Sequence, residues 1–384
     1  MKPNSAEPVR CAVLAGETSW HFQDLVRASR ELKLAGQANV ELSASRFEQI
    51  AGGLMSNQPN FSYEPTSTWK PDAVFVRTMP RGTLEQIVFR MDLLQRLMLA
   101  GTPVINSPKT IEASVDKYLC LAKLSAAEIP VPNTQVSQTV DQAVFDFKLL
   151  SGDVVIKPIF GSMGRGIERL TDLDQAKDCF DRLIQQGSVV YQQEFIPNDG
   201  SDLRLLVIDQ QVWSMRRKAT SGWITNISQG GQGFVHEPTE QEVDLALRSA
   251  RAVDASIAGI DLVYDQTTGQ AKVLEVNASV GWKEISQVLK VDFAKQVLLS
   301  ILNAFEASIM SAFMSFNKLD FLPDKNICKR LMSLRYASRE IRMLQGAVHC
   351  LMLASKQGRY QRQRSSPASM SNEQVRNLKI RCST

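Results

Sequence analysis

The sequence predicts an α/β protein in which a domain built on a parallel sheet precedes a larger body of helices and strands. Three observations support this prediction. Short apolar runs alternate with helical segments over the first hundred residues, which is typical of a parallel sheet. Two β-rich runs, 259–264 and 271–277, flank a turn-rich connection and predict an antiparallel hairpin. From residue 317 onward the chain carries 14 lysines and arginines against four acids, which predicts a basic C-terminal extension on a mildly acidic body.

Length and composition exclude several classes of protein. The 384 residues allow two or three domains of roughly 100–200 residues, and 44% hydrophobic with 22% charged residues is ordinary globular usage. No run reaches the roughly 18 apolar residues of a membrane span, and the N-terminus lacks the apolar segment of a secretory signal. The six cysteines are scattered without a C-x-x-C pair, which disfavours a zinc ribbon or a disulfide framework. We therefore expect a cytoplasmic protein with no membrane partner.

The first hundred residues are expected to form the parallel sheet and its helices. Apolar runs and helical spacing predict strands at 9–15, at 72–76 and from 103, and helices over 22–34 and 84–99. No G-x-G-x-x-G motif follows the first strand, so a dinucleotide-binding role for this part has no support.

The rest of the body is expected to mix helices with further strands. Pro130 and Pro132 end a helical pattern that begins at 109. The following elements are expected next: a helix over 140–150, a strand over 153–160, a strand pair near 204–217, a helix over 240–253, the hairpin over 258–277 and a helix over 293–302. The last helix is expected to close the globular body near Leu302.

The hairpin carries a candidate metal site. Side chains two residues apart on a strand point to one face, so Glu275 and Asn277 share a face. If the turn centres near 267–268, Asp261 lies opposite position 274 or 275 and joins them. Two carboxylates and a carboxamide are hard oxygen donors, the set that Mg²⁺ prefers beside water and phosphate. The alternative is a solvent-facing polar side of an amphipathic hairpin.

Lys157 and the loop after it form a candidate anion site. The lysine stands in an apolar run that is expected to be a buried strand, and a buried ammonium is costly unless an anion pairs with it. Three glycines within 161–166 allow backbone N–H groups to approach an anion closely. The loop is not a Walker A motif, because no Gly-Lys-Ser/Thr ends it. The alternative is an ordinary turn.

A third candidate group contains several charged residues. The segment 192–197, Gln-Gln-Glu-Phe-Ile-Pro, ends a strand-like stretch, and Asp202 and Arg204 share a face of the next strand. Cations then cluster at 216–218, before Asn226. Arginine forms bidentate bonds with phosphate and carboxylate, so this cluster is interpreted as an anion clamp beside the metal site. The alternative is a solvated cationic surface.

Together these motifs resemble the ATP-grasp superfamily, and within it the RimK-type α-L-glutamate ligases. The resemblance covers about residues 72–302 and depends on the order and spacing of motifs that are weak singly. They are Ser-Val-Asp-Lys at 114–117, Val-Ile-Lys-Pro at 155–158 with the glycine-rich loop, Gln-Glu-Phe-Ile at 193–196, Asp-Leu-Arg at 202–204, Thr-Asn at 225–226, Gly-Ile-Asp at 259–261 and Glu-Val-Asn at 275–277.

The resemblance implies three segments and two cofactors. The segments are an N-terminal pre-ATP-grasp α/β domain over 1–110, a first ATP-grasp lobe with a glycine-rich lid over 111–190 and a second lobe with the metal site over 191–302. The residues after 302 match no family, and their charge and helical spacing predict a basic, partly helical extension over 303–384. The cofactors are ATP and Mg²⁺ or Mn²⁺.

The resemblance also implies a role for each motif residue. The two lysines would hold ATP phosphates and the segment 193–196 would line the adenine. The full nucleotide-binding set would be Lys117, Lys157, Gly161, Ser162, Gly164, Gly166, Gln193, Glu194, Phe195, Ile196 and Asp202. The metal ligands would be Asp261, Glu275 and Asn277. The catalytic residues, which would face phosphate or the acyl substrate, would be Arg204, Arg217 and Asn226.

The implied reaction is ATP-dependent ligation of a carboxylate to an amine. The γ-phosphate of ATP would pass to an acceptor carboxylate, and the amine of L-glutamate or a similar amino acid would attack the acyl phosphate. The resemblance implies a ribosomal small-subunit protein or a pterin-type coenzyme as the acceptor. Ile224 and Val280 stand where the family usually has arginine and proline, so a catalytically weak ATP-binding regulatory module is the alternative function.

The basic extension leaves three interpretations open. A solvated extension is favoured. Alternatively, the extension binds RNA through its phosphates, which would be the one nucleic-acid contact expected of this protein. In the third interpretation, apolar residues at helical spacing over 331–351 form a helix that packs on the body or on a second subunit of a homo-oligomer.

Overall fold

The computed structural model describes residues 7–64, 67–161 and 164–317. It confirms an α/β protein that contains both parallel and antiparallel sheets. In these ranges no helix combines the length and the apolar character that crossing a bilayer requires. Ser162 lies outside the described residues, and so does the extension from 318 onward, to which the three interpretations above apply.

Four parallel strands form the N-terminal sheet in the order β2-β1-β6-β7, as the alternation of apolar runs and helices predicts. Helix α2 (Leu84–Leu99) has its predicted bounds because Thr83 and Gln86 form a capping box at its start. The remaining elements are β1 (Val9–Leu14), α1 (Trp20–Leu34), β2 (Val40–Ser45), β6 (Ala73–Val76) and β7 (Val104–Ile105). The sequence analysis misses β2, because polar residues interrupt its apolar positions.

A small antiparallel sheet follows β2 and is also absent from the sequence prediction. It consists of β3 (Ile50–Met55), β4 (Gln58–Tyr63) and β5 (Ser67–Thr68), after the short 3₁₀ helix η1 (Phe47–Gln49). Gly52 and Gly53 lie within β3, and five of its six side chains are exposed. No alternation of buried and polar residues therefore marks this strand in the sequence.

The helix expected over 109–129 is two helices, α3 (Pro108–Val115) and α4 (Lys117–Ala126). Asp116 has an extended backbone between them, and its carboxylate accepts hydrogen bonds from the backbone N–H groups of Tyr118 and Leu119. This is the geometry of an N-cap, which begins a new helix. The break makes Lys117 the first residue of α4.

A four-stranded antiparallel sheet with two helices forms the first lobe. Its strands are β8 (Thr134–Ser137), β9 (Val154–Ile156), β10 (Glu168–Leu170) and β11 (Val190–Glu194), in the order β10-β9-β11-β8. The helices α5 (Val140–Leu149) and α6 (Leu173–Gln185) share a core with it. The strand expected over 153–160 ends at Ile156, two residues before Pro158, which cannot donate to the sheet. Lys157 therefore lies just beyond the strand.

A five-stranded antiparallel sheet forms the second lobe. The order is β14-β13-β12-β15-β16, and Asp261 lies opposite Glu275 in the hairpin, as the sequence predicts. The strands are β12 (Ser201–Ile208), β13 (Gln211–Lys218), β14 (Gln232–His236), β15 (Ile257–Tyr264) and β16 (Ala271–Asn277). The helical elements are η2 (Ile227–Gln229), α7 (Glu240–Ala252) and α8 (Lys283–Leu289).

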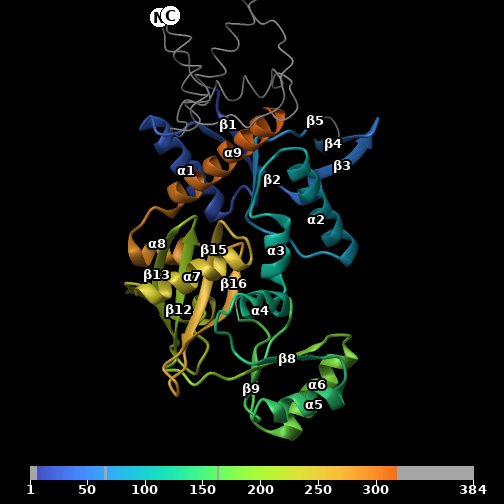
Figure 1. Ribbon diagram of the computed structural model, residues 1–384, viewed down its shortest axis with the longest axis vertical. Coiled ribbons are helices and arrows are strands. Elements are labelled where there is room, and N and C mark those ends of the chain that lie inside the picture. The colour runs from blue at the N-terminus through green and yellow to red at the C-terminus, as the bar shows by residue number, and fades with distance from the viewer. Residues whose placement is uncertain (1–6, 65–66, 162–163, 318–384) are drawn as a thin grey trace, which may run out of the picture.

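The last described helix, α9 (Phe293–Asn317), ends well beyond Leu302, where the sequence analysis expects it to end. It lies beside α1 on the N-terminal sheet (Figure 1), and Arg27 of α1 contacts Asp292, just before α9, at 2.8 Å. Phe305 and Ile309, both after the expected end, are buried. The N-terminal core is therefore completed by a helix from the far end of the body.

Three bodies follow one another along the long axis of the molecule (Figure 1). The parallel sheet with α1, α2 and α9 lies at one end, the five-stranded sheet lies in the middle, and the four-stranded sheet with α5 and α6 lies at the other end. This order places the candidate site between the two antiparallel sheets.

The length of α9 leads to a prediction about stability. A chain that ends at Asn303 should unfold at a lower urea concentration than one that ends at Asn317, because it lacks Phe305 and Ile309. Full burial of one such apolar side chain contributes about 1.5–3 kcal/mol. Urea denaturation of both chains measures the difference, and equal midpoints would contradict the prediction.

Candidate active site

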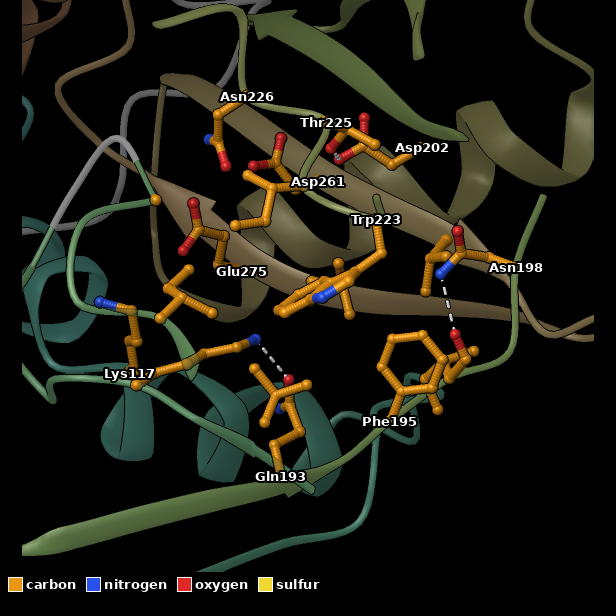
Figure 2. Close-up of a pocket in the computed structure, with 18 of the residues that line it drawn as sticks. Lys117, Gln193, Phe195, Asn198, Asp202, Trp223, Thr225, Asn226, Asp261 and Glu275 are labelled. Carbon is orange, nitrogen blue, oxygen red and sulfur yellow. Dashed lines mark hydrogen bonds between the residues drawn. The ribbon is translucent and has the colours of Figure 1, made fainter. Parts of the chain in front are cut away.

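A cavity lies between the four-stranded and the five-stranded antiparallel sheets. Figure 2 shows side chains from both sheets and from α4 pointing into it, with Lys117 of α4 and Gln193 facing Asp261 and Glu275. The predicted residues that line it are Lys117, Lys157, Gly161, Gly164, Gln193, Glu194, Phe195, Ile196, Asp202, Arg217, Asn226, Asp261 and Glu275. Gly166, Arg204 and Asn277 lie behind this lining and contact Pro158, Asp261 and Glu275, respectively.

Two lysines on the first-lobe side of the cavity have no carboxylate within 4.0 Å in the described part of the chain. Lys157 Nζ donates to Gln193 Oε1 at 2.6 Å, and Lys117 Nζ donates to the carbonyl oxygen of Gly161 at 2.9 Å. Burial lowers the pKa of Lys157 to about 8, although Glu275 opposes the shift, and burial also lowers the pKa of Lys117. Two half-buried ammonium groups with no carboxylate in contact suit an anionic ligand such as phosphate.

Two carboxylates face these lysines from the hairpin β15–β16. Burial raises the pKa of Asp261 to about 6, although Arg204 and Arg217 oppose the shift. Burial also disfavours ionisation of Glu275, but a hydrogen bond from Asn277 and the charge of Lys117 outweigh it, so the pKa of Glu275 is lowered. One oxygen of Asp261 is buried without a hydrogen bond of acceptable geometry, even though two arginine nitrogens lie within 3.1 Å. Asp261 is therefore already paired with two cations of the protein.

The donor set fits Mg²⁺. Asn277 Nδ2 donates to Glu275 at 3.0 Å, so the amide nitrogen is used within the site and its oxygen is left as an acceptor. Hard carboxylate and amide oxygens are the ligands that Mg²⁺ takes beside water and phosphate. The described residues contain no group of three or more His, Cys, Asp or Glu suited to a metal, so protein carboxylates alone would not complete the coordination shell.

Two predicted catalytic arginines are paired with carboxylates of the protein. Arg217 binds both oxygens of Asp202, at 2.7 and 2.6 Å, and also lies 3.1 Å from Asp261. Arg204 Nε lies 2.9 Å from Asp261, and Thr225 donates to Asp202 at 2.6 Å. The sequence analysis expects these arginines to face phosphate or acyl substrate and Asp202 to contact the nucleotide. In the structure they form a network with Asp261, a predicted metal ligand.

The segment 193–196 forms one end of the cavity. The carboxylate of Glu194 binds Lys272 at 2.7 Å and Asn133 at 2.7 and 3.0 Å, so this side chain stabilises the connection between the lobes. The ring of Phe195 packs edge-on against Trp223, with 5.7 Å between ring centroids. The two rings are nearly perpendicular, at 87°, and the guanidinium of Arg169 lies 3.4 Å from the centroid of the Phe195 ring, so the pair forms an apolar wall at this end of the cavity.

Trp223 and Asn198 are lining residues that sequence reasoning misses. Trp223 projects between the two sheets in Figure 2, and Asn198 Nδ2 donates to the carbonyl oxygen of Ile196 at 2.8 Å. An aromatic residue within the polar, glycine-containing stretch 220–226 is the one signal that the sequence offered for Trp223. Trp223 contacts Phe195, which is remote in sequence, and Asn198 stands in a loop. The periodicity of strands and helices therefore marks neither residue.

The glycine-rich loop contacts the segment 223–226. Gly164 has φ +68°, and a Cβ there would lie 2.7 Å from Asn226 Oδ1 and 3.5 Å from Ile224. Gly166 has φ +71°, and a Cβ there would lie 3.1 Å from Pro158. Only glycine adopts such a backbone without strain, so both the turn and the close approach to Asn226 require it.

This contact predicts an effect of Gly164→Ala. A left-handed backbone costs an L-residue roughly 1–2 kcal/mol, and the new methyl group also displaces Asn226. We expect ATP turnover to fall about fivefold to thirtyfold. Gly187→Ala is the matched control, because its φ is +71° but no atom lies within 4 Å of its Cβ position. Equal losses of ATP turnover in the two variants would show that backbone strain, and not the displacement of Asn226, causes the effect.

Comparisons with known proteins identify the family of the chain. Residues 114–301 match the family model described as the RimK-like ATP-grasp domain. The tetrahydromethanopterin:α-L-glutamate ligase of Methanosarcina acetivorans is 32% identical over 257 residues, which are 59% of this chain and 78% of that relative. A probable α-L-glutamate ligase of Haemophilus influenzae is 30% identical over 260 residues, which are 66% of this chain and 85% of that relative.

The fold is also found among solved structures. The ATP-grasp ligase PsnB, complexed with a minimal precursor, Mg and ADP, is similar with a TM-score of 0.59 and 21% identity, over 79% of this chain and 100% of that one. The fold and the cavity therefore define an ATP-grasp protein. The chain belongs to the RimK-like ATP-grasp family, and it is an ATP-dependent ligase that forms carbon–nitrogen bonds.

Proposed function

We propose that this ligase adds L-glutamate, or a similar amino acid, to an acceptor carboxylate. The observation that carries the proposal is the charge arrangement of the cavity. Lys117 and Lys157 have no carboxylate partner among the described residues. They face Glu275, which forms no ion pair within 4.0 Å among those residues, and Asp261, which Arg204 and Arg217 hold. A metal–triphosphate complex satisfies both sides, since phosphate oxygens pair with the ammonium groups and the metal pairs with the carboxylates.

Each side chain then has a defined task. Lys117 and Lys157 bind phosphate oxygens of ATP, and Asp261, Glu275 and Asn277 hold Mg²⁺. Bound Mg²⁺ would offset charge on the transferring phosphoryl group. The ADP and Mg named for the PsnB complex support this choice of ligands.

The surrounding residues position these groups and limit access of water. Arg204 and Arg217 act as positioning residues, because both contact Asp261. Phe195 and Trp223 form the apolar end that receives the adenine. Contact between Gly164 and Asn226 narrows the cavity, which protects an acyl phosphate from hydrolysis.

The chemistry runs in two steps. The acceptor carboxylate oxygen attacks the γ-phosphorus, the bond to the β-phosphate oxygen breaks, and ADP and an acyl phosphate form. The amine then attacks the acyl carbon, phosphate leaves, and the amine loses a proton as the amide forms. The reaction requires no side-chain nucleophile. The described residues that line the cavity include no cysteine or histidine, which agrees with this route.

We propose a pterin-type coenzyme as the first acceptor to test and a ribosomal small-subunit protein as the second. The name of the Methanosarcina acetivorans relative, which is aligned over 78% of its length, supports the coenzyme. The complex of PsnB with a precursor supports a peptide acceptor. Both acceptors offer a carboxylate, the chemistry that the site requires.

The test combines purified full-length protein, ATP, Mg²⁺, labelled L-glutamate and each acceptor in turn. We expect one ADP and one phosphate per labelled product. Formation of AMP and pyrophosphate would contradict an acyl-phosphate intermediate. Faster incorporation of labelled alanine than of labelled glutamate would contradict glutamate as the amino acid that is added.

A regulatory module is the second candidate function. The contact of Ile224 with Gly164, at a position where the family usually has a cation, favours it. Nucleotide binding without phosphate release for any acceptor would favour that candidate.

A further inference from the structure

Arg77 stands at the junction of the N-terminal and five-stranded sheets, directly after β6. Its Nη1 donates to the carbonyl oxygen of Ser279 at 3.2 Å, and its Nη2 lies 3.2 and 3.3 Å from the two ring nitrogens of His21. Its Nε is buried and has no hydrogen-bond partner among the described residues. Burial lowers the pKa of His21 to about 3, so this imidazole is neutral. No partner of the guanidinium therefore carries a negative charge.

The absence of a counter-charge sets Arg77 apart from comparable arginines. Six arginines in the described ranges are buried or half-buried, and the other five each contact a carboxylate within 4.0 Å. Those five are Arg90, Arg204, Arg216, Arg217 and Arg248. A desolvated guanidinium is stabilised by a paired anion, and in the described structure Arg77 has none.

The groups around Arg77 favour an incoming anion. The N-terminus of α1 adds partial positive charge, and the first turn of this helix contains no acid. Asp24, the acid nearest in that helix, is already bound by Arg27 and by the indole N–H of Trp282. Lys283 lies over the ring of Trp20 at 5.7 Å and adds a second cation. Glu284 is the only acid that influences Arg77 electrostatically, and it forms no ion pair with it in the described residues.

The position of Arg77 connects it to the reaction. Ser279, whose carbonyl oxygen it contacts, lies two residues after Asn277 of the candidate metal site. His21 and Arg77 also pack against Gly281 in the same loop. Arg77 and Ser279 do not line the cavity, so a group held by Arg77 would lie beside the loop that follows the candidate metal site.

We propose that Arg77 anchors an anion-binding subsite that takes a carboxylate of a ligase substrate. The proposal rests on the proposed function, in which neither carboxylate of glutamate is consumed when its amine reacts. The acceptor is the other source of this chemistry, if it carries a second carboxylate beside the activated one. Arginine suits the role because its planar fork binds carboxylate in a bidentate manner.

A purely structural role for Arg77 makes a different prediction. If the guanidinium only braces the loop at Ser279–Gly281, its loss should disturb the adjacent metal site and weaken nucleotide binding and carboxylate binding alike. A subsite predicts that carboxylate binding falls while nucleotide binding stays. The two roles are therefore separated by direct binding measurements, which need neither turnover nor a known acceptor.

The experiment measures binding of labelled L-glutamate and labelled glutarate to the full chain in the presence of ADP and Mg²⁺. The variants are Arg77→Gln, Arg77→Lys and, as the matched control, Arg81→Gln, which changes an exposed arginine four residues away. We expect Arg77→Gln to weaken binding about tenfold or more, the effect of losing a charge-assisted contact, and to leave ADP affinity within about twofold. Arg81→Gln should bind as the unchanged protein does. If Arg77→Gln does not fold, Arg77→Lys keeps the charge and should still bind several-fold more weakly, because it lacks the fork.

The two probes identify the source of the carboxylate. A loss confined to glutamate assigns the subsite to the amino acid, and a loss that includes glutarate assigns it to a dicarboxylate group that the acceptor can also supply. Unchanged binding in both Arg77 variants, no binding of either probe by the unchanged protein, or a matching loss of ADP affinity would overturn the proposal. If Arg77 governs carboxylate binding but no acceptor is ever ligated, the subsite stands and the proposed function fails.

Discussion

Replacing Glu275 with glutamine should reduce Mg²⁺-dependent ATP turnover by more than about a hundredfold, which exceeds the loss caused by a changed outer-shell partner of a metal ligand. Glutamine keeps the size of the side chain and removes its charge. The buried oxygen of Asp261 would then be the only carboxylate donor left to the metal at this site. Phosphate release measured across a range of Mg²⁺ concentrations tests this, and the Mg²⁺ concentration for half-maximal rate should rise together with the fall in rate.

An exposed carboxylate provides the control for this variant. Glu237→Gln changes an exposed side chain after β14, outside the cavity lining, and should retain full turnover. Circular dichroism checks that both variants are folded. A folded Glu275→Gln protein with unchanged Mg²⁺ dependence would exclude Glu275 as a metal ligand.

The metal site shows what the sequence is able to predict. Asp261, Glu275 and Asn277 come together because strands alternate side chains with period two and because a hairpin fixes which residues face each other. Both are local rules that apply within about twenty residues of chain. The capping box at Thr83 and Gln86 is local in the same sense, which is why the predicted bounds of α2 agree with the structure.

Ion pairs between residues that are remote in sequence could not be predicted. Arg217 pairs with Asp261, and Glu194 pairs with Lys272, across elements whose pairing no local pattern specifies. Arg217, whose charge looks free in the sequence, is therefore fully paired in the fold, while Arg77 has no carboxylate partner in the part of the chain that the structure describes. The continuation of α9 is missed for a related reason: the helix packs against α1 and β6, which lie more than two hundred residues earlier in the chain.

Replacing Lys157 with methionine should weaken ATP binding by about tenfold to a hundredfold, the cost of a lost charge-assisted contact. Methionine preserves most of the aliphatic stem and removes the ammonium that donates to Gln193. Titration with a fluorescent ATP analogue measures the change. Lys148→Met, which alters an exposed lysine on α5, is the control and should bind as the unchanged protein does.

The same substitution should have the opposite effect on the stability of the protein without nucleotide. Burial lowers the pKa of Lys157 to about 8, below its value of about 10.4 in an unfolded chain. The unfolded state therefore binds more protons between these values, so the penalty of burying the charge is fully present below pH 8 and disappears as pH rises toward 10. At pH 7 the Lys157→Met protein should melt at a higher temperature than the unchanged protein, and the difference in melting temperature should narrow at pH 9–10.

Saturating ATP with Mg²⁺ should reverse the order of the two melting temperatures, because only the protein with Lys157 gains the phosphate contact. A variant that melts lower at pH 7 without nucleotide would mean that the hydrogen bond to Gln193 outweighs the cost of the buried charge, and that Lys157 stabilises the fold whether or not phosphate is bound.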